Sequence, residues 1–213
     1  FVFQSALFME NKNYQEDLQH IRKMMEKSSR FISLSGISGV FAGLFALAGA
    51  IYVYFFFKKN GVDYFEGTVK YYEKDIITHL VIVAMIIMVL AISSGAYFTI
   101  KKSKAHHLQI WDATTKKLLY NFAIPLGIGG LFCAGLLYHG LHGLLSPATL
   151  IFYGLALFNA GNYTFSDIKY LGLCEMALGI VSLFFLGYGL FFWAVGFGVL
   201  HIVYGLIMHK KYK

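Results

Sequence analysis

The sequence predicts an all-α, polytopic membrane protein whose six transmembrane helices form three hairpins, with both termini in the cytoplasm. Its 213 residues are 58% hydrophobic and only 14% charged, which is about half the charged fraction of an ordinary globular domain. Apolar runs of 18 or more residues recur, and about 20 such residues span the hydrocarbon core of a bilayer. Because the backbone must satisfy its own hydrogen bonds in lipid, we expect these runs to be helices.

Turn and charge signals separate six apolar segments. The first segment ends at Lys58-Lys59-Asn60-Gly61, and the second ends at the lysines that begin with Lys101. Ser146-Pro147 opens the fourth, since proline is tolerated in the first helical turn, and Ser166 is a typical N-cap for the fifth. Gly187-Tyr188-Gly189 predicts a tight turn before the sixth. The expected spans are 31–57, 76–100, 118–138, 148–165, 168–186 and 189–209.

The positions of the basic residues predict the orientation of these spans. Placing both termini inside puts 14 of the 18 lysines and arginines on the cytoplasmic side, as the positive-inside rule requires. The net charge of +7 therefore follows from topology, and it suits a face that lies against anionic lipid headgroups. No nucleic-acid partner is needed to explain it.

The polar ends of the chain complete the domain organisation. Residues 1–30 form a cytoplasmic segment that contains a short amphipathic helix, which either lies at the membrane interface as a lead-in or binds a partner. Residues 31–209 form the transmembrane domain, and residues 210–213 form a basic tail. Met9 resembles a natural start, so we expect residues 1–8 to be an addition to the natural chain, without a part in its function.

Glycines repeat in the second half of the chain at an interval of 44 residues. The pairs are Gly135 with Gly179, Gly143 with Gly187, Gly154 with Gly198, and Gly161 with Gly205. Each unit is an apolar helix, a short external turn and a second apolar helix. Since both copies have the same orientation, this is a parallel repeat and not the inverted repeat found in many transporters.

Two stretches of this repeat carry a resemblance to a known family. They are YLGLCEMALGIVSLFFLGYGLFFWAVGFGVLHIVYG at 170–205 and LLSPATLIFYGLALFNAG at 144–161, where a Ser-Pro turn precedes a glycine-studded helix. Over residues 126–209 the chain resembles the HdeD-like family of small six-helix bacterial membrane proteins. The resemblance implies a bacterial inner membrane and a role in acid or envelope stress, and it supplies no catalytic residues.

Glu175 lies within an apolar helix, in the stretch LGLCEMALGI. A charge at bilayer depth costs at least ~2.5–3.5 kcal/mol on insertion scales, so such a residue normally faces protein or water and marks a candidate functional site. Three small residues share its helix face at spacings of three and four: Gly172, Gly179 and Ser182. Because small residues mark close helix contact in membranes, we expect Glu175 to face the bundle.

His201 lies on a similar stripe in the last span, which consists of Ala194, Gly198, His201 and Gly205. Glu175 stands thirteen residues before Tyr188 in the turn, and His201 stands thirteen residues after it. Antiparallel helices of equal rise bring the two to the same depth. The sequence thus predicts a Glu175–His201 contact, in which a hydrogen bond would lessen the cost of burying either group.

Further polar residues are expected near this depth, on other helices. They are Ser93 and Ser94 on the second span and Asn159 on the fourth. With Glu175 and His201 they would line a polar pocket open to the cytoplasm; alternatively, each bonds only to the backbone of a neighbouring helix. The pair itself is a structural staple, a proton or ligand site, or a metal site. A metal is disfavoured because it needs three or four ligands.

A second candidate for metal binding is the i, i+3 pair His139 and His142 in the stretch YHGLH. No acidic residue or cysteine lies near it in sequence, although Asp63, Glu66 or Glu73 could reach it. Two histidines at a wet membrane interface are usually unremarkable, so this pair is a weak candidate.

Two hypotheses about function follow from these observations. No nucleophile elbow, phosphate loop or other catalytic motif stands at a convincing spacing, so an enzyme is disfavoured and the cofactor is left open. The first hypothesis is a binding, transport or sensing protein that responds to a small molecule or to protons through Glu175 and His201, since histidine changes its charge near neutral pH. The second is a structural or interaction protein of the envelope that assembles with another membrane subunit or with its own copies.

Overall fold

The computed structural model describes residues 35–61, 73–105 and 110–212, and every regular element within these ranges is a helix. Five long helices come first: α2 (Gly36–Lys59), α3 (Lys74–Ala105), α4 (Ala113–Tyr138), α5 (Leu145–Ala160) and α6 (Asp167–Leu183). The last helix runs through three parts: α7 (Gly189–Trp193), a π-helix (Ala194–Leu200) and α8 (His201–Lys211). Short 3-10 turns at His142–Leu144 and Leu186–Tyr188 precede α5 and α7. The predicted all-α class is confirmed.

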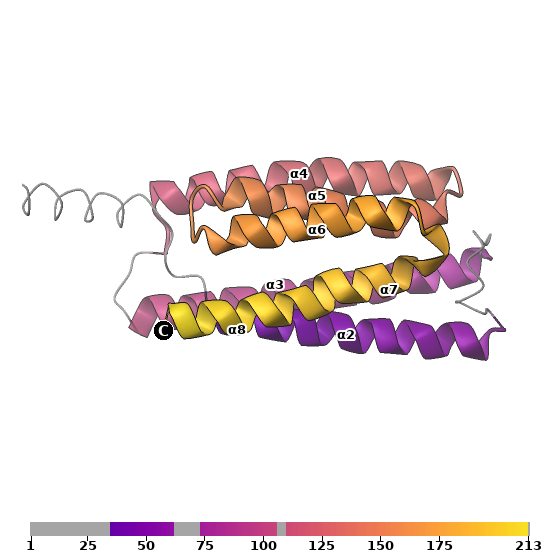
Figure 1. Ribbon diagram of the computed structural model, residues 1–213, viewed down its shortest axis with the longest axis horizontal. Helices are drawn as coiled ribbons and strands as arrows, with labels where there is room; N and C mark the ends of the chain where they lie inside the picture. The colour runs from indigo at the N-terminus through magenta and orange to yellow at the C-terminus, as the bar shows by residue number, and fades with distance from the viewer. Residues whose placement is uncertain (1–34, 62–72, 106–109, 213) are drawn as a thin grey trace, which may run out of the picture.

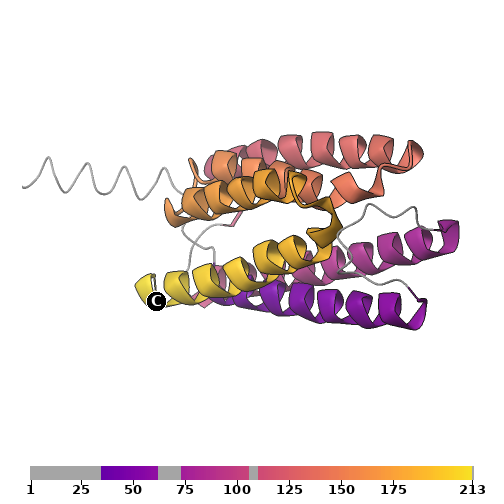
Figure 2. The same cartoon turned by 45° about the vertical axis from the view of Figure 1, so that its right-hand side comes forward.

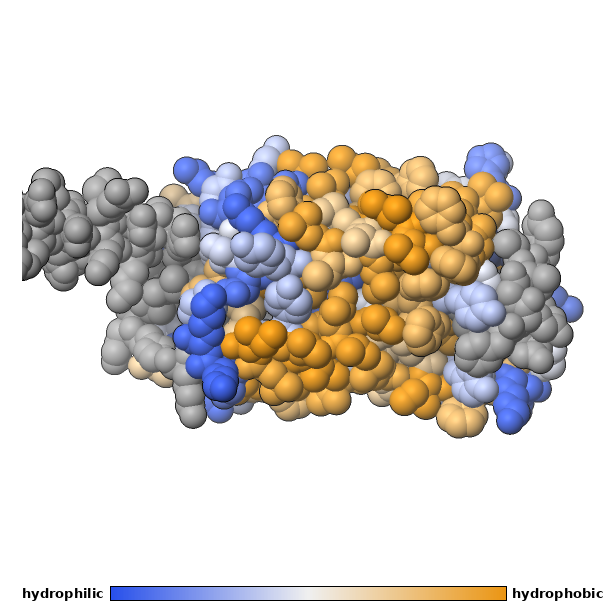
Figure 3. Space-filling view, viewed as in Figure 1, coloured by the Kyte–Doolittle hydropathy of each residue, from blue (hydrophilic) through white to orange (hydrophobic). Residues whose placement is uncertain are grey.

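Five helical stretches in the described residues are long and apolar enough to cross a membrane. They are α2, α3, α4, the stretch His142–Ala160 that contains α5, and the stretch Leu186–Lys211 that contains α7 and α8. With 17 residues, α6 stands at the lower limit of the usual ~17–25. Figure 3 shows a wide apolar band between two polar ends on the face that it displays, as expected for a protein surrounded by lipid.

Helix boundaries differ from the predicted spans by up to five residues in the second, third and fourth spans. The helix α3 continues to Ala105 instead of ending at 100, and α4 begins at Ala113 instead of 118. The helix α5 stops at Ala160 and not at residue 165, because the chain turns there through backbone bonds from Asn162 and Tyr163 to the last turn of the helix. Ser166 precedes α6 at the predicted N-cap position, but its side chain makes no capping hydrogen bond. The predicted amphipathic helix in residues 1–30, and Asp63 and Glu66, lie outside the described residues.

The helices are arranged in two three-helix layers, which both views separate clearly (Figures 1 and 2). In one layer α5 packs between α4 and α6, and in the other α2 packs between α3 and the last helix. The last helix also provides the main contacts between the layers, through α5 and α6. Any polar group between α6 and the last helix therefore lies at the junction of the two layers.

Glycines let the paired helices approach closely within each layer. A methyl group added at Gly154 would come within 2.6 Å of the carbonyl oxygen of Gly172, and one added at Gly172 would meet that of Gly154 at the same distance. In the other layer, a methyl at Gly43 would come within 2.6 Å of the carbonyl oxygen of Gly198. Such backbone contact is the usual role of small residues between membrane helices. Gly154 and Gly198, a pair in the predicted repeat, thus both lie at helix contacts.

The third predicted hairpin, which pairs residues 168–186 with 189–209, is open in the structure. Its first helix, α6, packs mainly against α5, and its second helix packs mainly against α2. The physical reason lies in the glycines, because Gly172 turns toward α5 while Gly198 and Gly205 turn toward α2. The two helices of this hairpin still meet at a few points, and Glu175 is at one of them.

Candidate functional site

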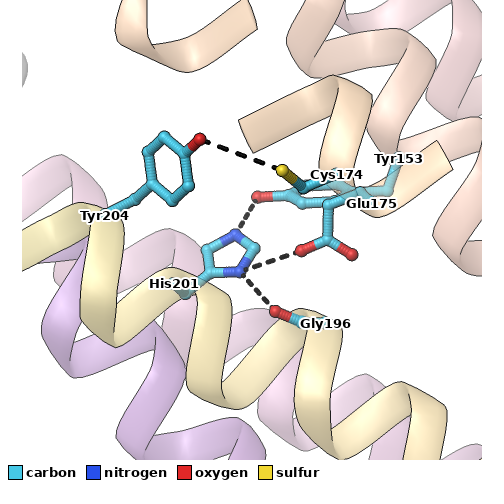
Figure 4. Close-up of polar contacts among 6 residues, drawn as sticks. All are labelled: Tyr153, Cys174, Glu175, Gly196, His201 and Tyr204. Atoms are coloured by element: carbon cyan, nitrogen blue, oxygen red, sulfur yellow. Dashed lines mark hydrogen bonds and ion pairs between the residues drawn. The ribbon is translucent and has the colours of Figure 1, made fainter. Parts of the chain in front are cut away.

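Glu175 is completely buried, with 0% of its surface exposed. The predicted stripe on α6 is confirmed, since Gly172, Gly179 and Ser182 are buried as well. The two faces of α6 differ in composition. Small residues and Glu175 lie on the buried face, while the large apolar residues Leu173 and Ile180 are exposed on the opposite face. The carboxylate thus lies inside the protein and points toward the last helix (Figure 4).

The predicted contact between Glu175 and His201 is present. Nδ1 of His201 lies 3.3 Å from Oε1 of Glu175, and the imidazole is nearly buried, with 6% of the residue exposed. The two residues thus lie at the same depth, as their equal distances from Tyr188 predict, even though the two helices are otherwise splayed.

Two further groups hold the imidazole ring of His201 in place. Nδ1 lies 3.1 Å from the carbonyl oxygen of Gly196, and Nε2 lies 2.8 Å from the hydroxyl of Tyr153 on α5. A carbonyl can only accept, so Nδ1 carries a proton and donates it to Gly196. In the neutral ring Nε2 then accepts from Tyr153, and in the imidazolium form Nε2 donates to the tyrosine oxygen. We call Glu175, His201, Tyr153 and Gly196 the buried site.

The backbone next to His201 is a π-helix from Ala194 to Leu200. The ring of His201 donates to the carbonyl oxygen of Gly196, which lies five residues earlier in this segment. This side-chain bond has the same five-residue spacing as the backbone hydrogen bonds that define a π-helix, and it adds to them. Gly196 also meets the carboxylate, because a methyl group added there would come within 2.5 Å of Oε2 of Glu175. Only glycine leaves room for the carboxylate at this point, and π segments are frequent at functional sites.

The carboxylate of Glu175 is not satisfied by its surroundings. Neither of its oxygens has a hydrogen-bond partner among the described residues, and the contact with His201 is an ion-pair distance without hydrogen-bond geometry. The hydroxyl of Ser182, two turns farther along α6, is also buried without a partner in the described part of the chain. Such groups normally find partners in folded proteins, so an exception calls for a physical explanation.

The other predicted members of a polar pocket do not converge on Glu175. Ser93 is exposed, and Ser94 donates to the carbonyl oxygen of Ala91 in its own helix. Both lie on α3, which packs against α2. Asn159 lies on α5 six residues beyond Tyr153, and its backbone carbonyl accepts from Asn162. The alternative was a bond from each residue to the backbone of a neighbouring helix. Ser94 also bonds only to a helix backbone, but to that of its own helix.

The weak metal candidates lie at the opposite end of the molecule from the C-terminus. His139 caps the end of α4, and its ring stands against Tyr138, while His142 begins the 3-10 turn before α5. In the part of the chain that the structure describes, no group of three histidine, cysteine or acidic side chains is placed to hold a metal ion.

A second polar contact joins α6 to the last helix at the end that holds the C-terminus. The carboxylate of Asp167, the first residue of α6, accepts from Lys211 at 3.0 Å and from the hydroxyl of Tyr212 at 2.5 Å. Burial acts to raise the pKa of Asp167, but the hydrogen bonds from Tyr212 and Lys211 outweigh it and lower that pKa below its ordinary value. We call Asp167, Lys211 and Tyr212 the end cluster.

Lys102 of α3 extends the end cluster to the first hairpin. Its ammonium donates to the backbone carbonyl of Tyr212 at 3.2 Å and lies 5.7 Å from the ring of Phe165. Phe165 in turn stacks on Tyr212 with ring centroids 3.9 Å apart. Lys211 and Tyr212 are therefore held between α3 and the start of α6.

Comparisons with family models, with curated proteins and with solved structures found no match to this chain. The resemblance to the HdeD-like family therefore stays a prediction that rests on the glycine and apolar pattern alone. The geometry of the buried site is then the main guide to function.

Sequence reasoning missed Tyr153, Gly196 and the π-helix. A signal for Tyr153 was present, since it is a hydroxyl-bearing residue near the middle of the apolar stretch LIFYGLAL. The pattern VGFG at 195–198 places two glycines next to the histidine helix, but no sequence rule distinguishes a π-helix from an α-helix there.

Proposed function

We propose that this chain is a multi-pass membrane protein that binds and releases a proton at Glu175 and His201 and changes state when it does so. One observation carries the proposal: a completely buried carboxylate lies 3.3 Å from an imidazole nitrogen, and neither of its oxygens has a hydrogen-bond partner in the described residues.

A purely structural role gives no reason for such a costly arrangement. Leaving a buried polar group unpaired costs about 1–3 kcal/mol, and more for a charged group. Well-packed apolar residues of similar volume often replace a buried ion pair with no loss of stability. A site that takes up and releases a proton, in contrast, must keep an ionisable side chain, even where burial makes its charged form unfavourable.

The surroundings of Glu175 favour a proton over a larger ligand. Glu175 has no exposed surface and fills the space beside Gly196. Ser93, Ser94 and Asn159, which a solute pocket would use, are not joined to the pair by any described hydrogen bond. A proton needs no cavity, so the close packing around Glu175 is no obstacle to binding one there.

The proposal includes the topology and location that the sequence predicts. The chain crosses the membrane six times, with α6 as the shortest span, and both ends lie in the cytoplasm of a bacterial inner membrane. Lysine-rich ends of α3 and α8 support this orientation, because both lie at the end of the bundle that holds the C-terminus. Labelling of Lys210→Cys and Lys59→Cys from one side of intact cells tests it, with opposite accessibility expected.

Infrared difference spectroscopy tests the proton site directly. The full chain in lipid bilayers is compared between acidic and alkaline buffer, and the band of a protonated carboxylic acid is followed. We expect a band that titrates in the wild type and is missing in Glu175→Gln, whereas Asp167→Asn retains it. If Glu175→Gln leaves the difference spectrum unchanged, no proton is exchanged at Glu175 and the proposal is wrong.

The second candidate function is a structural one, in which Glu175 and His201 only join the two layers. The direct contact between them and the absence of exposed surface on Glu175 favour it. In that case Glu175→Gln and His201→Ala both lower the melting temperature in detergent, while the infrared spectrum shows no titrating carboxyl group. Lowered stability together with a titrating band supports the proton site.

A further inference from the structure

His201 Nδ1 faces two acceptors with only one proton to donate. The carbonyl oxygen of Gly196 is 3.1 Å away and Oε1 of Glu175 is 3.3 Å away, and both acceptors converge on the same nitrogen in Figure 4. The structure shows the proton used by the carbonyl, since only that contact has hydrogen-bond geometry. Gly196 is also a member of the π-helix.

We infer that the π-helix at residues 194–200 is a proton-controlled switch, in which Gly196 and Glu175 compete for the Nδ1 proton of His201. This inference rests on the proposed function, because it needs Glu175 to change its protonation state. It adds what that change does to the fold: the winner of the competition decides whether the segment stays π-helical or becomes α-helical.

The direction of the switch follows from the strength of the two acceptors. When Glu175 carries a proton, its neutral carboxyl is a weak competitor and the Nδ1–H group of His201 bonds to Gly196, which supports the π-helix. When Glu175 releases its proton to solvent, the carboxylate becomes a charged acceptor, and hydrogen bonds to charged groups are about twice as strong. The Nδ1–H group then turns to Glu175, and the carbonyl of Gly196 loses the bond that ties it to residue 201.

The titratable groups that face His201 come from two neighbouring helices. Glu175 is on α6, and Tyr153 is on α5 at Nε2. On its own helix, Tyr204 faces Cys174 of α6, with 3.9 Å between oxygen and sulfur. The helix α2 meets this part of the last helix through Gly39 and Gly43, and residues 36–47 of α2 include no titratable side chain. Glu175 is therefore the group whose ionisation acts most directly on Nδ1.

A change from π to α geometry would be transmitted to the C-terminal end of the protein. A π segment contains an extra residue, so its loss turns the following helix by one residue, or about 100°. Gly205 would then leave its close contact with Gly36, and Lys211 would leave Asp167. Proton release at the buried site is thereby coupled to opening of the end cluster.

The sequence offers a precise reporter for the Gly196 carbonyl. Gly196-Phe197 is the only Gly-Phe dipeptide in the chain. Labelling glycine carbonyls with ¹³C and phenylalanine nitrogens with ¹⁵N therefore yields a single carbonyl–nitrogen cross-peak in solid-state NMR of the full chain in bilayers. The carbonyl shift of that peak responds to loss of the hydrogen bond from His201.

We expect the cross-peak to move between acidic and alkaline buffer in the wild type. In Glu175→Gln it should keep its acidic position at every pH, because a neutral amide cannot act as a charged acceptor. In His201→Phe it should be independent of pH and shifted from the acidic position, because the ring donor is gone. A Gly127→Ala variant, at a site with open space around it, should behave like the wild type.

The test separates the switch from the proton site on which it rests. If the infrared band of Glu175 titrates while the Gly196 cross-peak stays in place, the proton site stands and the switch is wrong. If the band does not titrate, the proposed function fails, and a cross-peak that still moves with pH in Glu175→Gln assigns the movement to another group. Either result overturns the inference.

Discussion

Two polar contacts join the same pair of helices in very different surroundings. In the buried site, His201 of the last helix faces Glu175 of α6, and only 7% and 0% of the two side chains are exposed. In the end cluster, Lys211 of the last helix meets Asp167 of α6, and 55% of the lysine side chain is exposed. Both contacts bridge the two layers, so the difference between them lies in access to water.

The surroundings decide how each contact is satisfied. Asp167 accepts three hydrogen bonds, from the lysine and tyrosine that follow one another at the C-terminus. Glu175 accepts none among the described residues. Exposed ion pairs add little to stability because water screens and replaces them, whereas a buried charge without its partner is very costly. Breaking the contact in the end cluster is therefore expected to cost less stability than breaking the contact in the buried site, although the end cluster has more hydrogen bonds.

His201→Ala should produce the largest loss of stability. It leaves Glu175 buried without its nearest partner, and breaking a buried pair in this way costs about 3–5 kcal/mol. Lys211→Ala is the matched change in the end cluster, and it should leave the melting temperature close to that of the wild type. Thermal unfolding of the purified protein in detergent measures both. Equal losses in the two variants would contradict the distinction between the contacts.

Gly196→Ala should have the next largest effect, because the added methyl group would collide with Oε2 of Glu175. Overpacking of this kind costs about 1–3 kcal/mol, and thermal unfolding in detergent measures the loss. The control is Gly127→Ala on α4, which has open space around it and should be neutral or slightly stabilising, since alanine is the better helix former.

A double change tests whether the collision with Glu175 is the cause. Combining Gly196→Ala with Glu175→Ala should cost less than the sum of the two separate changes, because the shorter side chain makes room for the methyl group. Strict additivity of the unfolding free energies would show that Gly196 is needed for a reason other than the carboxylate.

The sequence predicted the contact between Glu175 and His201, at matching levels along their two helices, but not the way the helices pack around them. Depth depends only on distance from the turn at Tyr188, and helix rise is nearly constant. Which helices pack against each other depends on how their glycine-containing faces fit together in three dimensions. The helix α6 has residues that fit against α5 and others that fit against the last helix. The glycines of the last helix meet Gly36 and Gly43 of α2, which are far away in sequence. The separation of the two helices of the third hairpin was therefore not predicted.

Tyr153 and Gly196 could not be identified for a related reason. Their roles require knowing how α5 and the last helix are rotated about their axes, and a π-helix changes that rotation by one residue. Of the predicted stripe, Gly198, His201 and Gly205 are buried, whereas Ala194 at the start of the π-helix is only half-buried. His201 and Gly205 lie after the π-helix, where spacing follows ordinary helical periodicity.

Tyr153→Phe and Tyr212→Phe form a matched pair that sharpens the comparison further. Each removes one hydroxyl, which bonds to His201 at 2.8 Å in the first case and to Asp167 at 2.5 Å in the second. Loss of a buried hydrogen bond costs about 0.5–1.5 kcal/mol, and an acceptor left unsatisfied raises the cost. We expect Tyr153→Phe to lower the melting temperature more, because water can replace the hydroxyl of Tyr212. The reverse order in thermal unfolding would show that the end cluster is the drier of the two sites.

The smallest expected effect is the response of the end cluster to acid. The pKa of Asp167 is lowered in the folded protein, against the effect of burial, by hydrogen bonds from Tyr212 and Lys211. A carboxyl group whose pKa is lower when folded stabilises the fold above its unfolded pKa of ~3.9, and this contribution disappears as the pH falls through the folded pKa.

Asp167→Asn should therefore lower the melting temperature slightly at neutral pH, by less than about 2 °C. The difference from the wild type should vanish in strong acid, where Asp167 is protonated in both the folded and the unfolded chain. Glu175→Gln serves as the contrast, since its effect arises in the buried site and needs no ion pair with Lys211. A difference in melting temperature between Asp167→Asn and the wild type that persisted at low pH would mean that the carboxyl group acts through its shape and packing. The end cluster would then resemble the buried site more closely than the exposure of the two sites suggests.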